Sequence, residues 1–385
     1  MNATGSFDFA RMTNKLNIAL VRRGYSASGG AEAYLKRLAH GMAEAGHEVQ
    51  LIATDEWPDE QWPLGSVRHL RAKTIIGFAD ELEQIRPQLR CDVLFSLERV
   101  WSCDAFRAGD GVHRAWLARR RGFEIPLKQF VRAVSRKHQD LLQLEKSLFE
   151  KRNARQVIVA SQMVADEIVD LYGYPTDKID LVRNGIPFAK FQFDPDLRER
   201  SRSELKLKPD QIALLFAGSG WERKGFLFAI EAMSICKNRK LRLLVAGRGN
   251  ARAYKTIRLL FWREDPVRFV GEVADLRPVY SAADIFILPT IYDPFSNACL
   301  EALACGLPVI TTRSNGFSEI IENGINGSII DNPADLTGLR DAIRFWSDSS
   351  RRDTVRAANI ARASHFDISK NVEQTLDVLT RVSSG

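Results

Sequence analysis

Two carboxylates, Asp293 and Glu301, flank the start of a predicted helix at 297–305 and are the first candidates for chemistry. Ser296 is a suitable N-cap residue for that helix, and Gly306 is a suitable end. The unpaired N–H groups and positive dipole end of a helix N-terminus suit a phosphate. Carboxylates beside it would instead accept hydrogen bonds from sugar or ribose hydroxyls. A capped helix with one ordinary surface acid is the alternative, which this stretch alone leaves open.

A pair of cations forms a second candidate site. A predicted strand at 213–217 leads into a glycine-rich turn that contains Gly218, and the adjacent residues Arg223 and Lys224 precede a predicted helix. A guanidinium can bind two oxygens at once, and an ammonium supplies compact charge. Because the helix dipole disfavours cations at a helix start, a diphosphate explains the pair better than two exposed charges do.

A glycine-rich turn also follows the first predicted strand, at 16–21, and contains Gly29 and Gly30. Backbone amides at such a turn, before a helix reaching about residue 45, can hold phosphate. The turn is neither G-x-G-x-x-G nor a Walker loop, so a tight turn that simply requires glycine is equally compatible.

A Gly-Asp-Gly loop places Asp110 near His113, two titratable groups on flexible backbone. Polar chemistry is often found on such loops, although a lone histidine is more often a surface or core residue. The loop is a candidate catalytic site, and nothing ranks Asp110 against His113.

These candidates must be positioned by alternating strands and helices, which predict an α/β fold with parallel sheets. The 385 residues are enough for two domains, and the linker is expected near Asn184-Gly185, where regular structure breaks. No apolar run approaches the roughly 18 residues of a membrane span, and residues 1–15 lack the order of a secretory signal. Five cysteines without metal-ligand spacing favour reduced thiols in the cytosol, and a net charge of +7 suggests an acidic partner.

Residues 114–152 mix basic and large apolar side chains. The basic ones are Arg119, Arg120, Arg121, Lys128, Arg132, Arg136, Lys137 and Lys146, and the apolar ones include Trp116, Leu117, Phe123, Phe130, Leu141 and Leu142. At helical spacing, such a mixture suits a helix that lies on the surface of an anionic bilayer. A solvated basic helix packed on its own domain is the alternative.

The stretch around Asp293 resembles the E-x7-E signature of retaining glycosyltransferases of the GT-B fold, family four. Asp293 stands where the signature has its first Glu, and its side chain is one methylene shorter. The sequence Glu-Ala-Leu-Ala-Cys-Gly-Leu-Pro-Val from Glu301 matches the signature closely. The resemblance implies that Asp293 contacts the donor sugar, that Glu301 holds the ribose, and that Asp110 and His113 face the acceptor and reacting sugar. It implies a donor site that contains Gly29, Gly30, Gly218, Arg223, Lys224, Val270, Pro294, Phe295, Ser296 and Asn297.

The same resemblance implies two facing Rossmann-like doubly wound domains, at 1–185 and 186–365. The last helix, at about 366–385, would cross back onto the first domain. A similar basic, aromatic segment occurs in lipopolysaccharide core glucosyltransferases, whose acceptor is a lipid in the inner leaflet.

We therefore expect retaining transfer of a hexose from a nucleoside-diphosphate sugar, with UDP as the expected nucleotide, to a saccharide acceptor such as lipopolysaccharide core or another lipid-linked glycan. The enzyme would work at the cytoplasmic face of the membrane, docked through residues 114–152, without a cofactor, metal or nucleic acid. Two other classes of protein remain as alternatives. One is an NAD-dependent oxidoreductase, although this sequence lacks the G-x-G-x-x-G turn that such an enzyme needs. The other is a basic nucleic-acid-binding protein, although the sequence contains no recognised binding motif.

Overall fold

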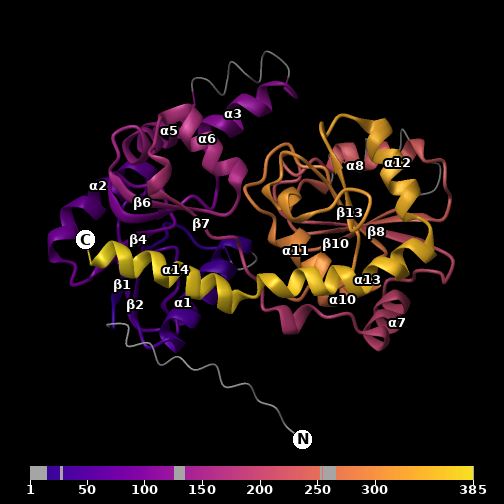
Figure 1. Cartoon of the computed structure of the whole chain (residues 1–385), viewed down its shortest axis with the longest axis horizontal. Coiled ribbons are helices and arrows are strands. Elements are labelled where there is room, and N and C mark those ends of the chain that lie inside the picture. The colour runs from indigo at the N-terminus through magenta and orange to yellow at the C-terminus, as the bar shows by residue number, and fades with distance from the viewer. Residues whose placement is uncertain (1–14, 27–28, 125–134, 252–253, 255–265, 385) are drawn as a thin grey trace, which may run out of the picture.

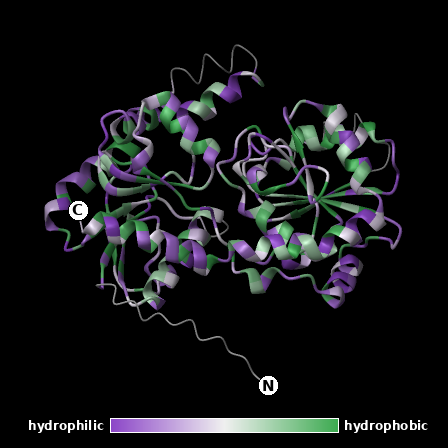
Figure 2. Ribbon diagram, in the orientation of Figure 1, coloured by the Kyte–Doolittle hydropathy of each residue, from purple (hydrophilic) through white to green (hydrophobic). Residues whose placement is uncertain are grey.

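The computed structural model describes residues 15–26, 29–124, 135–251, 254 and 266–384. They form two α/β domains that lie side by side, each with one parallel sheet between helices (Figure 1). Apolar residues are concentrated on the strands, whereas the helices alternate between apolar and polar residues (Figure 2). This is the layering expected when both faces of a parallel sheet are covered.

The first domain contains a seven-stranded sheet in the order β3-β2-β1-β4-β5-β6-β7. Its strands are β1 (Asn17–Val21), β2 (Glu48–Thr54), β3 (Val67–Leu70), β4 (Val93–Ser96), β5 (Cys103–Arg107), β6 (Ala154–Val159) and β7 (Ile179–Leu181). Its helices are α1 (Gly30–Glu44), α2 (Ile75–Ile85), α3 (His113–Arg121), α5 (Arg136–Phe149) and α6 (Gln162–Tyr172). The strand order reverses between β1 and β4. Open α/β sheets bind ligands at such a point, beyond the carboxyl ends of the strands.

The second domain contains a six-stranded sheet in the order β10-β9-β8-β11-β12-β13. Its strands are β8 (Ile212–Ala217), β9 (Leu241–Ala246), β10 (Val267–Gly271), β11 (Ile285–Leu288), β12 (Val309–Thr312) and β13 (Gly327–Ile330). Its helices are α7 (Pro195–Glu204), α8 (Phe226–Ile235), α10 (Arg277–Ala282), α11 (Asn297–Ala304), α12 (Leu336–Trp346) and α13 (Ser349–Ala363). The order reverses between β8 and β11, the strands that precede Gly218 and Asp293.

The chain crosses between the domains twice, and the two crossings are hydrogen-bonded to each other. The Ile186 N–H donates to Phe366 O at 3.1 Å, and the Ile368 N–H donates to Ile186 O at 2.9 Å. The last helix, α14 (Ile368–Ser383), then lies across the first domain beside α1 (Figure 1). Its Leu379 is part of that domain's apolar core. The fold predicted from the sequence, including the returning helix, is confirmed.

The strands expected at 16–21 and 213–217 and the helix expected at 297–305 are present as β1, β8 and α11, within one residue of their expected ends. The sequence did not predict β5 and β13. Both are short, and the polar residues in Cys103–Arg107 and the Gly-Ser start of Gly327–Ile330 weaken the strand signal. The expected flexible loop is also shorter than the sequence indicated, because His113 is the first residue of α3.

The basic segment is not one continuous helix lying on the surface. It contains α3 and α5, with residues 125–134 between them, including Lys128, Phe130 and Arg132, lying outside the described residues. Trp116 and Leu141 are partly buried and pack against apolar clusters of the first domain. Several of its apolar residues serve the core of the first domain instead.

Candidate functional site

A cleft of about 1680 Å³ lies between the two domains and is lined by residues at the carboxyl ends of strands from both sheets. Residues from both domains line it, and they include most of those that the sequence singled out. Those residues are Gly29, Gly30, Asp110, Gly218, Arg223, Lys224, Asp293, Phe295, Ser296, Asn297 and Glu301. The cleft is therefore the candidate site.

The second-domain wall joins the predicted cations to the predicted acid. Lys224, at the turn before α8, forms an ion pair with the Asp293 carboxylate, and Arg223 Nη1 donates to Tyr292 O at 3.0 Å. Burial lowers the pKa of the Lys224 ammonium, although the Asp293 charge opposes that shift. A ligand with negative charge can share this cation, because an ammonium has three donors.

The N-terminus of α11 lies in the same wall. The Ser296 hydroxyl accepts from the Cys299 N–H at 3.4 Å, as an N-cap does. Asn184 of the first domain donates to Asn297 Oδ1 at 2.8 Å and to Phe295 O at 3.3 Å. The helix terminus is thus held against the linker that joins the domains.

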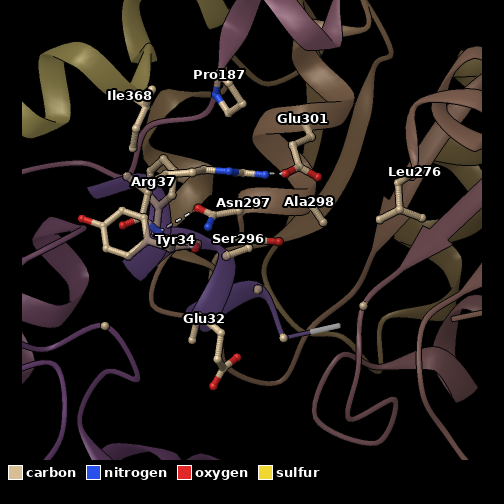
Figure 3. A pocket seen from close by; sticks show the side chains of 18 of the residues that line it. Glu32, Tyr34, Arg37, Pro187, Leu276, Ser296, Asn297, Ala298, Glu301 and Ile368 are labelled. Carbon is tan, nitrogen blue, oxygen red and sulfur yellow. Dashed lines mark hydrogen bonds and ion pairs between the residues drawn. The ribbon is translucent and has the colours of Figure 1, made fainter. Parts of the chain in front are cut away.

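Glu301 points from α11 toward the first domain. Its carboxylate accepts from the Tyr280 hydroxyl at 3.0 Å, and Arg37 Nη1 of α1 lies 3.7 Å from Oε1 (Figure 3). Burial raises the pKa of Glu301, and the charge of Arg37 acts against that shift. The carboxylate is an acceptor held in one orientation, as binding of a diol requires.

On the first-domain wall, Asp110 faces the cations of both domains. Enclosure by the cleft walls disfavours its ionisation, but the charges of Arg22, Arg99 and Arg223 outweigh this and lower its pKa. Arg22 Nη1 lies 3.5 Å from Asp110 Oδ2, and 57% of the Asp110 side chain remains exposed. Asp110 is therefore an ionised, accessible carboxylate opposite the second-domain wall.

His113 is placed differently from Asp110. Its Nε2 lies 3.0 Å from Nδ1 of His138 on α5, and the side chain is not among those that line the cleft. Burial and the nearby charge of Arg99 lower the pKa of His113 to about 3. The imidazole is therefore neutral at neutral pH, and its catalytic role remains a prediction.

Two further predicted donor residues also lie off the cleft lining. Val270 is in β10, and Pro294 packs over Gly111 of the first domain. Sequence reasoning missed Arg22 and Arg37, which face Asp110 and Glu301, because a single arginine near a turn or on a helix carries no distinguishing pattern. It also missed Asn184, which was seen only as part of a linker.

Glu319 binds the N-terminus of α6 across the domain boundary. Its carboxylate accepts from the N–H groups of Gln162 at 3.0 Å and Met163 at 2.8 Å, and it pairs with Arg183 at 2.7 Å. These contacts link the second domain to the first, which is a structural role.

Within the described ranges, no group of three or more His, Cys, Asp or Glu side chains is arranged to hold a metal ion. In the same part of the chain, no helix is both long and apolar enough to cross a membrane.

Two family models match the chain, one in each domain. Residues 28–190 match the model described as Glycosyltransferase Family 4, and residues 211–348 match Glycosyl transferases group 1. The D-inositol 3-phosphate glycosyltransferase of Pseudarthrobacter chlorophenolicus is 28% identical over 92% of this chain and 90% of its own. An uncharacterized glycosyltransferase of Methanocaldococcus jannaschii is 31% identical, but the match covers 45% of this chain and 46% of that protein.

Solved structures share the fold over nearly the whole chain. WaaG, a glycosyltransferase involved in lipopolysaccharide biosynthesis, has a TM-score of 0.79 at 19% identity, covering 94% of this chain and 99% of its own. Anabaena HepE in complex with UDP-glucose has a TM-score of 0.73 at 19% identity, covering 95% of this chain and all of its own. With both domains matched by glycosyltransferase models and the fold shared with such enzymes, this chain belongs to the GT-B glycosyltransferases of the family 4 and group 1 type.

Proposed function

We propose that the protein transfers a hexose from a nucleoside-diphosphate sugar, UDP-linked as in the HepE complex, to a saccharide acceptor with retention at the anomeric carbon. One observation carries the proposal: Arg223, Lys224 and the N-terminus of α11 converge with the Glu301 carboxylate on a single wall of the cleft. That wall offers positive groups for a diphosphate beside an acceptor for ribose hydroxyls.

The bond between the anomeric carbon and the diphosphate oxygen would break while the acceptor hydroxyl attacks the same face of the sugar. The acceptor proton passes to an oxygen of the departing diphosphate. Arg223, Lys224 and the α11 terminus stabilise the negative charge that grows on this group. Asp293 and Asp110 approach from opposite walls and orient the transferred sugar and the acceptor. No metal ion enters this scheme.

A ligand screen by thermal unfolding tests the donor class. UDP, GDP or ADP should raise the melting temperature, because a ligand that binds only the folded state stabilises it. NAD and a short oligonucleotide should leave the melting temperature unchanged. A shift with NAD alone would favour an oxidoreductase, and a shift with oligonucleotide alone would favour a nucleic-acid-binding protein.

We further propose that the acceptor is lipid-linked, with lipopolysaccharide core as one candidate, and that the first domain docks on the cytoplasmic face of an anionic membrane. The basic residues of α3, α5 and the following turn that remain exposed are Arg114, Arg121, Arg136, Lys137, Lys146, Lys151 and Arg152. Between α3 and α5 lies a hollow of about 480 Å³ whose lining combines Arg121 and Lys146 with Leu117 and Leu142. Basic and apolar groups together suit an anionic lipid surface.

Co-sedimentation with phosphatidylglycerol vesicles tests the docking surface. Each basic residue near such a surface contributes about 1 kcal/mol, so binding should be strong at low salt and weak at high salt. Changing Arg121, Arg136, Lys137 and Lys146 together to Gln should release the protein. The matched control changes Lys237, Arg239, Lys240 and Arg313, which are exposed on the second domain. Equal release by both sets, or no sedimentation of the wild type, would refute the docking surface.

A further inference from the structure

Tyr292 connects the two domains where the donor and acceptor walls meet. It belongs to the second domain, directly precedes Asp293, and is 1% exposed. Its hydroxyl oxygen accepts from the Val112 N–H at 2.8 Å, and its proton is donated to Glu167 Oε2 on α6 at 2.7 Å. Burial and the Glu167 carboxylate raise the pKa of Tyr292 well above its ordinary value, so the hydroxyl keeps the proton it donates.

The contact with the acceptor loop leaves no room for another side chain. Gly111, between Asp110 and Val112, has a left-handed φ of +70°. A Cβ atom at this position would overlap the Tyr292 hydroxyl and ring and the Pro294 ring. The tyrosine therefore lies directly against the peptide that follows Asp110.

The ring of Tyr292 is held by α3. Trp116 stacks on it with ring centroids 6.3 Å apart, and the Arg119 guanidinium lies 5.5 Å from its centroid. Arg119 also binds Glu167 at 2.6 Å and the Ser314 hydroxyl of the second domain at 2.9 Å. The Asp293 N–H donates to Ser314 O at 2.9 Å, so Arg119 is connected through Ser314 to the residue that follows Tyr292.

The acceptor loop is also fixed from within the first domain. The buried Glu145 carboxylate accepts from the His113 N–H at 2.6 Å and from Arg99 Nε at 3.0 Å. Arg99 Nη2 donates in turn to Gly111 O at 2.6 Å. These contacts hold the carbonyl of Gly111, whereas the next N–H group, that of Val112, is held only across the domain boundary by Tyr292.

We propose that Tyr292 is a positioning residue that aligns Asp110 with Asp293 when the two domains are closed. Since Val112 and Glu167 belong to the first domain and Tyr292 to the second, domain separation would break both hydrogen bonds together. The acceptor side would then be correctly formed only while the donor wall is in place. This inference rests on the proposed function for its catalytic consequence, but its structural part does not.

The test compares Tyr292→Phe with Tyr174→Phe. Tyr174 is a buried first-domain tyrosine whose hydroxyl donates to Ala154 O at 2.8 Å, so its variant loses a similar hydrogen bond away from the boundary. Tyr292→Phe should speed amide hydrogen exchange of the peptide around Val112 by about tenfold, the scale of one lost hydrogen bond. Tyr174→Phe should leave exchange of that peptide unchanged.

With the donor identified, Tyr292→Phe should also lower kcat by about tenfold while the affinity for the nucleoside diphosphate stays within about twofold. Unchanged exchange at Val112 would overturn the inference, as would faster exchange with an unchanged kcat, or an equal loss of kcat and nucleotide affinity. Because hydrogen exchange requires no nucleotide, failure of the wild type to bind any donor would refute the proposed function separately.

Discussion

The two walls of the cleft reach their geometry in different ways. On the second-domain wall, the candidate groups come from two short stretches, 218–225 and 292–301, that bind each other through Lys224 with Asp293 and Arg223 with the Tyr292 carbonyl. On the first-domain wall, the loop that carries Asp110 is held by Arg99 and Glu145, which lie on either side of it in the sequence, and by a tyrosine of the other domain.

This difference separates a wall whose cations and acid pair with each other within one domain from a loop whose hydrogen bonds come from both domains. We therefore expect a nucleotide to meet a nearly preformed set of cations on the second domain, and we expect the Asp110 loop to be correctly placed only when the domains are together. Substitutions on the two walls should therefore damage different steps, donor binding on one side and transfer on the other.

The largest effect is expected for Asp110→Asn, which keeps the size of the side chain and removes its charge. Transfer should fall by about a hundredfold or more, the usual scale for a positioned polar group, while donor binding survives. Initial rates at saturating donor measure this. Asp170→Asn, an exposed site on α6, is the matched control, and a wild-type rate in Asp110→Asn would return the loop to a structural role.

Replacing Lys224 with Ala should cost at least about tenfold in kcat/KM, because a charge-assisted contact contributes roughly 1.5–3 kcal/mol. It also leaves the Asp293 carboxylate without its ion-pair partner. The loss should be accompanied by weaker nucleoside-diphosphate binding. Lys240→Ala, at an exposed lysine of the same domain, is the control, and unchanged turnover in Lys224→Ala would remove this residue from the donor site.

A smaller effect on stability is expected at the domain boundary. Glu319→Ala removes the carboxylate that accepts from the first two N–H groups of α6 and pairs with Arg183, while Ser161 remains the N-cap. The free energy of unfolding should therefore fall by about 1 kcal/mol, the scale of a lost hydrogen bond. Urea denaturation measures this change. Glu322→Ala, an exposed acid shortly after it, should have almost no effect, and equal stability of the two variants would show that these contacts contribute nothing.

A pH dependence of stability is expected at His113. Burial and the charge of Arg99 lower its pKa from 6.5 to about 3. Between these two pH values the histidine is protonated in the unfolded chain and neutral in the folded chain. Its contribution to the free energy of unfolding therefore decreases as the pH falls from about 6.5 toward about 3. His113→Asn should lose less stability than wild type between pH 7 and pH 5, and an identical decrease in both would contradict the shifted pKa. His40→Asn, at an exposed histidine of α1, is the control.

Sequence patterns singled out Lys224, Asp293 and Glu301, which the structure brings together on the second-domain wall, because they come from two short stretches that each follow a buried strand. Their roles stay predictions. Sequence patterns also located Asp110 but not what holds it. Arg99, Glu145 and Tyr292 are adjacent only in the folded chain, and a buried ion pair has no local pattern. In the basic segment, helical spacing alone did not show that Trp116 packs against the core of the first domain, and membrane docking of this segment stays a prediction.

Nucleotide affinity in two variants tests the division between the walls most directly. Isothermal titration with the nucleoside diphosphate that most raises the melting temperature would be applied to wild type, Glu301→Gln and Asp110→Asn. We expect Glu301→Gln to bind about tenfold more weakly, since a charged acceptor is lost, and Asp110→Asn to remain within about twofold of wild type. Equal weakening in both variants, or full affinity in Glu301→Gln, would contradict the assignment of donor binding to the second-domain wall.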